Sequence, residues 1–464
     1  MLKLSRILTT VMPPTLHGRM GTALRILMIG YLIRVFAMPL FGSVDAATTI
    51  WVSTVLADQG KLILSNDPPP IFYIHALLLT LFRPFYPPNI LDIVRSNSGF
   101  TPPALFLGIM LAEPGIAGVL FVLKIPYLVA DFATAMLLAR FPKTPDGAIS
   151  LLKAWVFNPV VIYVSYFIGQ FDIVPVFFMV LAFYWLRENR RTPAILSLAV
   201  SMTFKLFAVA LIPFFLITFL KDSRGWKERV QTIAIAAFGS VAPLVVWLVI
   251  SAFQTTYYES ANLALSGGIV NGFFGTVLYN RGQQANPLAQ GLVTFIDYSA
   301  KFSLVPFFPD TILVVPFVFA AALLALVHHG KISFWRFWNL IFAVLLLFYA
   351  FSLFHVQWFL WVQPFLLFAV VQNRSRYLPP AILLTAGFLF YIWYWDDLLT
   401  SALLVPTLPA AYHWMGPLTL LHSLGLPGTS LVTLARSAFS GFCVYTAYLA
   451  LRPNGTSVPP SNAY

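Results

Sequence analysis

A carboxylate just beyond the first apolar run is the first candidate for chemistry in this sequence. Asp45 comes four residues after Phe41, where that run ends. A carboxylate in this position can reach a cavity at a membrane surface. It acts as a general base if a substrate hydroxyl lies within hydrogen-bond distance, and otherwise it is an interfacial acid that reinforces topology. Asp67, before three prolines that restrain the backbone, is a candidate for the same cavity.

Three further ionisable residues, Lys124, Asp131 and Lys205, lie inside apolar runs. Ionisable groups at membrane depth are costly and usually face the protein interior, so each is a functional candidate. A structural alternative pairs Asp131 with Lys124 or with another interior cation. Lys205 is suited to bind an anionic headgroup such as a phosphate, and snorkelling to the interface is its structural alternative.

Polar residues also gather where two later runs end. Gln170 and Asp172 lie in a short turn predicted to face outward, and His355, Gln357 and Trp361 form an aromatic-rich segment. An aromatic belt explains tryptophan at the headgroup level but requires neither histidine nor glutamine, so these residues are candidate ligand contacts. The sequence has no HExxH, Walker, GxSxG or paired-cysteine motif, which argues against a zinc protease, an ATPase and a serine hydrolase.

The elements that position these residues are predicted from composition. The chain has 464 residues, of which 59% are hydrophobic and 9% charged, against about 25% charged in a typical soluble domain. Several apolar runs reach the ~20 residues that cross a hydrocarbon core, and backbone in lipid must satisfy its own hydrogen bonds. We therefore expect an all-α, polytopic membrane protein with about 11–13 transmembrane segments, some broken or re-entrant.

Charge patterning gives the orientation. The net charge of +12 comes from short basic clusters between apolar runs, such as the one from Lys221 to Arg229, which indicates cytoplasmic loops rather than nucleic-acid binding. The predicted organisation is a cytoplasmic lead-in over 1–23, one transmembrane domain over 24–452 and a polar tail over 453–464. The stretches 42–68 and 252–310 are predicted extracytoplasmic loops, and the single cysteine, Cys443, excludes an intrachain disulfide.

Two apolar stretches do not fit a simple count of spans. Thr101–Phe141 is too long for one span and short for two, and is interpreted as a broken ascent followed by a full descent. Thr192–Leu220 begins and ends at basic clusters, so both of its ends are predicted to be cytoplasmic. A hairpin of two half-length helices with Lys205 near its tip satisfies that requirement, and broken helices at membrane depth typically line a polar cavity.

Taken in order, these motifs resemble the GT-C superfamily of membrane glycosyltransferases, in particular the archaeal and bacterial mannosyltransferase-like enzymes and the phosphatidylinositol-glycan mannosyltransferase I catalytic subunit. The resemblance covers about Arg34 to Pro364. The residues that carry it are Asp45, Pro68-Pro69-Pro70-Ile-Phe-Tyr73, Lys124-Ile-Pro-Tyr-Leu-Val-Ala-Asp131, Asn158-Pro159-Val-Val-Ile-Tyr163, Gly169-Gln170-Phe171-Asp172, Phe204-Lys205 with Pro213, and His355-Val-Gln357-Trp358 with Trp361 and Pro364.

The resemblance implies a GT-C-like architecture and an inverting transfer of a hexose, usually mannose or glucose, from a polyprenyl- or dolichyl-phosphate sugar on the extracytoplasmic face. It implies that Asp45 is the catalytic base, and that Lys205, with His355 and Arg281 behind it, offsets charge on the leaving phosphate. Many relatives have a second acid beside the first, whereas Ala46 and Ala47 follow Asp45 here. The absence of this second acid argues against a bound metal ion, so no cofactor is predicted. Asp58 or Asp67 is the candidate for the second carboxylate.

The expected partners are the lipid-linked sugar donor, a glycan, glycolipid or protein acceptor, membrane lipids, and a small membrane-protein subunit of the kind some complexes carry. The expected location is the plasma membrane of a prokaryote or the endoplasmic reticulum of a eukaryote, with the site facing outward or into the lumen. The alternative function is a transporter or flippase for a sugar or lipid-linked sugar, which should show an internal repeat that the sequence lacks. A noncatalytic scaffold would not explain acids clustered on one face.

Overall fold

The computed structural model describes the chain in segments. They cover residues 12–60, 69–85, 113, 115–243, 245, 301–303, 311–352, 355–395, 399–425 and 428–452. The statements below refer to these residues.

Helices make up almost all of the described chain. The N-terminal part contains the 3-10 helix η1 (Pro14–Arg19), α2 (Met20–Ala37), α3 (Val44–Gln59), α4 (Pro69–Leu81), η2 (Arg83–Phe85), α7 (Ile116–Leu123) and α8 (Ile125–Leu138). The central part contains α9 (Pro145–Val156), α10 (Pro159–Ile162), the π-helix η3 (Tyr163–Ile168), α11 (Ile173–Arg187), α12 (Arg191–Phe204), the 3-10 helix η4 (Leu206–Leu211), α13 (Ile212–Asp222) and helical residues 226–243.

The C-terminal part completes the bundle. It contains β1 (Lys301–Ser303), β2 (Thr311–Leu313), α17 (Val314–His328), α18 (Phe334–Phe351), η6 (Val356–Val362), α19 (Gln363–Gln372), α20 (Arg374–Trp395), η8 (Ser401–Leu404), η9 (Pro409–His413), α21 (Pro417–Ser423) and α22 (Gly428–Leu451). The predicted helical class is therefore confirmed, with one exception. The strands β1 and β2 pair antiparallel, with Lys301 opposite Leu313, at the end of the stretch predicted as a loop over 252–310.

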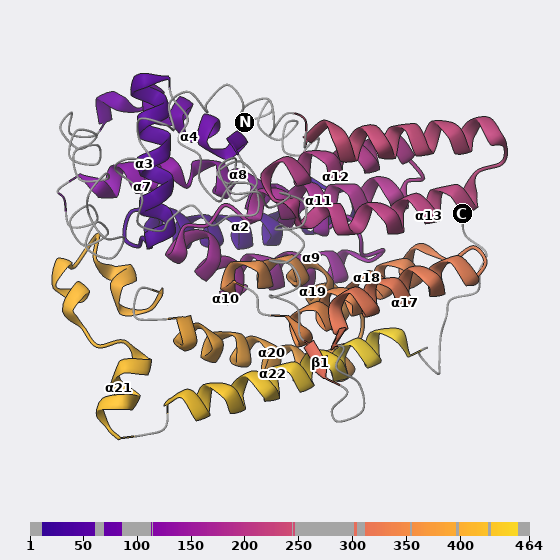
Figure 1. Cartoon of the computed structure of the whole chain (residues 1–464). Helices are drawn as coiled ribbons and strands as arrows, with labels where there is room; N and C mark the ends of the chain where they lie inside the picture. Colours follow the sequence, from indigo (N-terminus) through magenta and orange to yellow (C-terminus); the bar gives the residue numbers. More distant parts are fainter. Residues whose placement is uncertain are drawn as a thin grey trace, which may run out of the picture.

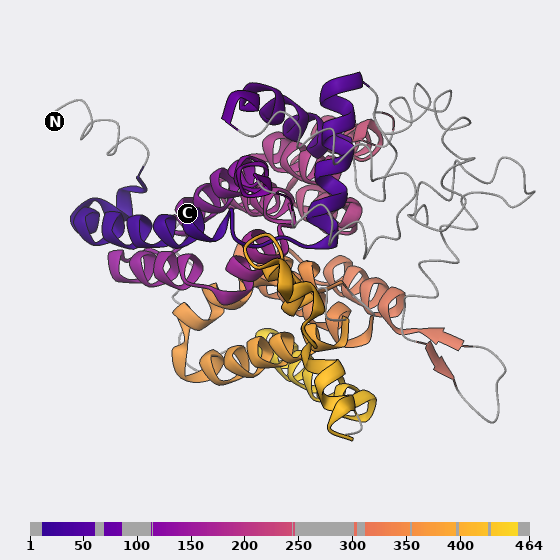
Figure 2. The same ribbon diagram turned by 90° about the vertical axis from the view of Figure 1, so that its left-hand side faces the viewer.

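Most long helices run side by side, while α3 runs across them near one end of the bundle (Figure 1). In the C-terminal part, α22 packs against both α18 and α20, and α11 packs against α12 and α8. The view turned by 90° shows β1 and β2 projecting from the helices (Figure 2). The extended apolar core joins the N-terminal, central and C-terminal helices.

Four described helical stretches are long and apolar enough to cross a membrane, namely Pro14–Ala37, Ile116–Leu138, Pro145–Ile168 and Phe334–Phe351. The surface of α2 also has the pattern of a helix that faces lipid. Met28, Leu32 and Phe36, four residues apart, are 60%, 60% and 73% exposed, whereas Gly30 and Arg34 on the other side are buried. Apolar side chains exposed along a whole helix face are rare on soluble monomers. These features indicate a membrane protein, and the number of crossings stays a prediction.

Some predicted boundaries differ from the structure. The helix predicted from residue 24 is preceded by helical turns from Pro14, within the predicted lead-in over 1–23. The predicted loop over 42–68 contains α3, because Ser43 caps its first turn and Gly60, with φ 64°, ends it. The α3 face that includes Ala47 and Ile50 is buried, so α3 is part of the fold rather than a connecting loop.

Cations gather at the end of the bundle opposite Asp45, where they bind helix C-termini. Arg187 Nη1 donates to the carbonyl of Arg140 at 2.9 Å, and Arg376 Nη2 donates to the carbonyl of Leu449 at 2.6 Å. Lys221 Nζ donates to the carbonyl of His329. Positive charge is favourable at the negative end of the helix dipole. The basic clusters that predicted cytoplasmic loops therefore lie together at one end.

Candidate functional site

Asp45 lies in the first turn of α3. The Ser43 side chain accepts a hydrogen bond from the backbone N–H of Ala46 at 3.3 Å and donates to the carbonyl of Ile168 at 2.7 Å. The cap therefore starts the helix and also attaches it to η3. Asp45 itself is exposed, and a helix N-terminus favours a negative side chain. Asp45 is therefore an exposed carboxylate in the first turn of a helix whose start is fixed by the buried Ser43.

Gln170 is the direct partner of Asp45. Its Nε2 donates to Asp45 Oδ2 at 2.5 Å, and the glutamine is 3% exposed. The turn that presents Gln170 follows the π-helix η3, where Gly169 adopts φ 79° and the backbone N–H of Gln170 donates to the carbonyl of Val164 at 3.0 Å. Single π-helical turns are frequent at functional sites. Two residues predicted independently from sequence are therefore brought into contact across 125 positions.

The hairpin predicted over Thr192–Leu220 is present. The helix α12 ends at Phe204, Lys205 is extended with φ −151° and ψ 127°, and η4 and α13 lead back. The two ends meet, because Arg191 donates to the Ser223 hydroxyl and to the Asp222 carbonyl, both at 3.0 Å. The predicted hairpin is therefore confirmed, with Lys205 at the break between its two halves, and the cytoplasmic location of its two ends stays a prediction.

The ammonium of Lys205 lies against the turn that also presents Gln170. Its Nζ is 4.6 Å from the centroid of the Phe171 ring, a cation–π geometry. Gln170, the residue before Phe171, contacts Asp45. Asp45 and Lys205 therefore contact consecutive residues of one turn and lie on the same end of the bundle.

Asp172 and Trp361 form the inner side of this site. The indole Nε1 of Trp361 donates to Asp172 Oδ1 at 3.0 Å, and both side chains are buried. Phe207, two residues beyond Lys205, packs edge-on against Trp361 with ring centroids 4.6 Å apart. The hairpin tip is therefore fixed against η6 and the start of α11. Asp172 and Trp361 are therefore buried behind the turn that presents Gln170, and their contact with substrate stays a prediction.

Two of the remaining predicted site residues lie at the start of η6, the element that also carries Trp361, and two lie outside the described residues. His355 is exposed at the start of η6, with its ring 5.2 Å from that of Trp358, and Gln357 is buried. Asp67 and Arg281 fall outside the described residues. The core of the site is thus Asp45, Gln170 and Lys205, with Asp172 and Trp361 behind them.

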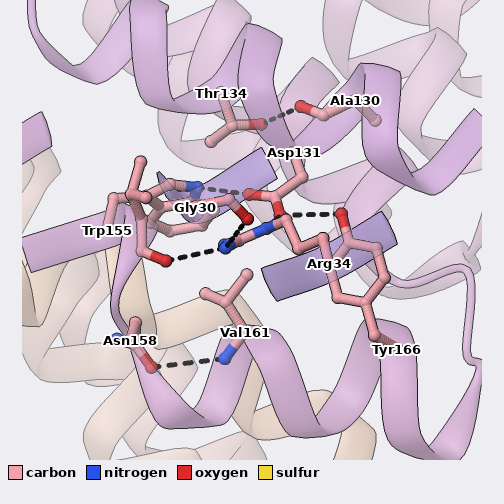
Figure 3. Close-up of polar contacts among 10 residues, drawn as sticks. Gly30, Arg34, Ala130, Asp131, Thr134, Trp155, Asn158, Val161 and Tyr166 are labelled. Atoms are coloured by element: carbon pink, nitrogen blue, oxygen red, sulfur yellow. Dashed lines mark hydrogen bonds and ion pairs between the residues drawn. The ribbon is translucent and has the colours of Figure 1, made fainter. Parts of the chain in front are cut away.

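A buried ion pair lies below the site. Arg34 Nε donates to Asp131 Oδ2 at 2.5 Å, and the two side chains are 0% and 1% exposed. Asp131 also accepts from the Trp155 indole at 2.7 Å and from the Tyr166 hydroxyl at 2.9 Å (Figure 3). The prediction that Asp131 pairs with an interior cation is confirmed, but the cation is Arg34 and not Lys124.

Lys124 has a different environment, in the single residue between α7 and α8. Its Nζ donates to three backbone carbonyls, those of Met38, Phe41 and Tyr166, at 2.9, 2.6 and 2.8 Å. The Lys124 side chain is fully buried, which agrees with the expectation that an ionisable residue in an apolar run faces the protein interior. Of the stretch Thr101–Phe141, the described helices run from Ile116 to Leu138, are interrupted at this lysine, and are together long and apolar enough for the predicted descent. Most of the predicted ascent lies outside the described residues.

Sequence reasoning missed several residues that build the site. Arg34, Trp155 and Tyr166 complete the ion-pair cluster. The Asn158 side chain donates from Nδ2 to the side-chain Oε1 of Gln363 at 2.9 Å, which joins the start of α10 to the start of α19. One sequence signal could have identified Arg34. A buried aspartate requires a cation as its partner, and Arg34 is a cation within the first apolar run. Tyrosine and tryptophan donors carry no comparable sequence signal.

The base of the hairpin, far from Asp45, has its own polar cluster. Glu228 Oε2 accepts from the backbone N–H of Arg224 at 2.9 Å and lies 3.2 Å from Arg191 Nη1. The Arg224 hydrogen bond and then the Arg191 charge hold the pKa of Glu228 below its ordinary value. Its ionised form is therefore favoured when the hairpin ends are together, and this contribution to stability is lost as pH falls through that lowered pKa.

An apolar groove adjoins the segment that leads into α3. Its volume is about 320 Å³, and its lining is Phe41, Tyr163, Phe167, Leu389, Ile392, Leu399, Thr400, Leu403 and Leu404. Phe41 and Phe167 stack at 4.0 Å, and the backbone N–H of Gly42 donates to the Leu403 carbonyl at 3.1 Å. The groove is at the lower end of the size range of small-molecule sites. Phe41, which lines the groove, is four residues before Asp45 in the sequence.

No family model matches the chain, and no curated protein matches it in sequence. Among the described residues, no group of three or more His, Cys, Asp or Glu side chains is arranged to hold a metal ion.

Proposed function

We propose that this protein is a multi-pass membrane glycosyltransferase that moves a hexose, mannose first among the candidates, from a polyprenyl-phosphate carrier to an acceptor hydroxyl. The observation that carries the proposal is the shared turn Gln170–Phe171, which binds Asp45 on one side and Lys205 on the other. An exposed carboxylate and a cation on either side of one buried turn provide the base and the positive charge that transfer from a lipid phosphate requires. The architecture proposed is GT-C-like, with the site on the extracytoplasmic face.

The reaction proposed is a single displacement. Asp45 takes the proton of the acceptor hydroxyl, whose oxygen attacks the anomeric carbon of the sugar from the face opposite the phosphate. The bond between that carbon and the phosphate oxygen breaks, so the anomeric configuration inverts and the lipid phosphate leaves with the bonding electrons. The Lys205 ammonium offsets the charge that develops on this phosphate. Gln170 holds Asp45 in position, and the apolar groove takes the adjoining part of the lipid chain.

The direct test uses the purified full-length chain in liposomes. We expect transfer of radiolabelled mannose from polyprenyl-phosphate mannose to a lipid-linked acceptor, and no transfer from nucleotide-activated mannose. Flux of sugar or flipping of the lipid without transfer would instead support the transporter, a class that also uses broken helices.

Lys205→Ala is expected to raise the KM for the lipid donor about tenfold to a hundredfold. This range corresponds to a lost hydrogen bond to a charged group, of about 1.5–3 kcal/mol. Lys205→Arg should retain most of the affinity, because the charge remains. The matched control is Lys153→Ala, which removes an exposed lysine from the last turn of α9. Donor kinetics unchanged by Lys205→Ala would remove the phosphate role from this residue.

The groove makes a separate prediction. Leu404→Trp fills the space beside Phe167 and should raise the KM for a long-chain donor several-fold, while a short-chain analogue of the same donor is used as before. Leu408→Trp, at an exposed residue of the same segment outside the groove, is the control. Equal effects of Leu404→Trp on both donors would show that the lipid chain lies elsewhere.

A further inference from the structure

Lys124 contacts the backbone on both sides of the proposed site. Met38 and Phe41, whose carbonyls accept from its ammonium, lie in the segment between α2 and the Asp45 turn. Tyr166, whose carbonyl is the third acceptor, lies in the π-helix that leads to Gln170. Asp45 and Gln170 are therefore carried by two backbone segments that converge on one buried nitrogen.

The fit around Lys124 leaves little room for another arrangement. A Cβ atom on Gly169 would lie 3.1 Å from Lys124 Cε and 3.2 Å from the Ala46 Cβ, so the glycine turn fits between the lysine and the start of α3. The hydrogen bond from the Ser43 hydroxyl to the Ile168 carbonyl closes the same junction. A shift of the Lys124 side chain thus moves Gly169, the residue before Gln170, or Ala46, the residue after Asp45.

The chemistry of the contact also distinguishes Lys124 from a lysine that snorkels. An ammonium has three N–H donors, and here all three are used by carbonyls inside the protein. Removing an ammonium from water is costly unless its donors are satisfied. The three carbonyl oxygens therefore have to stay within hydrogen-bond distance of Lys124 Nζ. An apolar residue of similar length would leave three carbonyls without this donor in a dry interior. The lysine fixes the relative position of three backbone segments.

We infer that Lys124 is a positioning residue for the reaction: it holds the Asp45 turn in register with the Gln170 turn. The catalytic consequence rests on the proposed function, whereas the positioning itself does not. Lys124 touches no substrate in this assignment and acts through Asp45.

The catalytic test compares kcat with KM. Lys124→Met is expected to lower kcat about a hundredfold, the order that a displacement of about 1 Å costs, while the KM for the lipid donor stays within about twofold. Lys153→Met, an exposed lysine replaced in the same way, should leave both constants unchanged. A KM effect equal to the kcat effect, or no effect on kcat, would overturn the catalytic role.

A second test needs no activity. In a Cys443→Ala background, which is free of other cysteines, Asp45→Cys and Gln170→Cys are joined by a thiol reagent with a two-carbon spacer. We expect rapid cross-linking with Lys124 present and at least severalfold slower cross-linking with Lys124→Met. Equal rates would refute the positioning role even if the wild-type protein transfers sugar, and slower cross-linking would support it even if no transfer is found.

Gly169→Ala provides an alternative if Lys124→Met does not fold. The added methyl group pushes on both Lys124 and Ala46 at a residue with φ 79°, and should slow the cross-linking in the same way. Gly441→Ala is the control, because a Cβ there meets nothing within 4 Å. Cross-linking unaffected by Gly169→Ala would contradict the inference.

Discussion

Asp45→Ala is expected to lower the rate of sugar transfer about a hundredfold to ten-thousandfold, with little change in the KM for the lipid donor. This range is what a positioned general base typically contributes. The carboxylate is exposed at the start of α3 and held by Gln170, so its removal takes away the base without removing a core contact. The measurement is kcat and KM with purified protein and a lipid-linked donor.

The matched control lies on the same helix. Asp58, in the last turn of α3, pairs with Arg83 at 3.2 Å, and Asp58→Ala should change the rate less than about threefold. Asp58 was also a sequence-based candidate for a second catalytic acid, so the control tests that role. Turnover that persists in Asp45→Ala would remove Asp45 as the base.

Asp131→Leu is expected to destabilise the protein by about 3–5 kcal/mol, because it leaves Arg34 charged, buried and without its carboxylate. Arg34 and Asp131 are essentially inaccessible, and Trp155 and Tyr166 also lose their acceptor. The measurement is denaturant unfolding in detergent micelles, with thermal unfolding as a check.

Two further variants test whether the loss of stability comes from the burial of the Arg34–Asp131 pair. The Arg19–Asp146 pair has a similar distance, 3.0 Å, but its side chains are 55% and 80% exposed, so Asp146→Leu should cost less than about 1 kcal/mol. The double variant Arg34→Met with Asp131→Leu removes both charges and should recover most of the loss. Equal destabilisation by Asp131→Leu and Asp146→Leu would mean that the buried pair does not stabilise the fold.

Tyr166 links the ion pair to the site. Its hydroxyl donates to Asp131 and its carbonyl accepts from Lys124, so one residue of the π-helix is held at both its side chain and its backbone. Charged groups at membrane depth are expensive, and here they converge on the element that precedes Gln170. Arg34, Asp131 and Lys124 are therefore best understood as the support of the exposed carboxylate of Asp45.

The hairpin around Lys205 and the helical class could be predicted from the sequence because each follows from a simple physical requirement. Basic residues at both ends of 192–220 require both ends on one side, and a chain with few polar residues requires helices in lipid. The helices that make up almost all of the described chain confirm the class, and the contacts of Arg191 with Asp222 and Ser223 confirm the hairpin.

Other features could not be predicted because they depend on contacts distant in sequence. The partner of Asp131 lies 97 positions away, and nothing local distinguishes Arg34 from Lys124. The excess of carboxylates over 42–68 predicts an outward loop, whereas the side chain of Ser43 caps the first turn of α3 within it. The contact between Gln170 and Asp45 depends on a left-handed glycine after a π-helix, a geometry without a sequence signature of its own.

The central claim is that Asp45 and Lys205 share one water-accessible site on the outer side of the membrane. It is tested most directly by labelling single cysteines at residues 45, 205 and 331 with a membrane-impermeant maleimide, in a Cys443→Ala background and in vesicles of both orientations. We expect cysteines at 45 and 205 to react from the extracytoplasmic side and to be protected by polyprenyl-phosphate mannose. A cysteine at 331, where the lysine side chain is 69% exposed at the basic end, should react from the other side. Labelling of positions 45 and 205 from opposite sides would contradict the account.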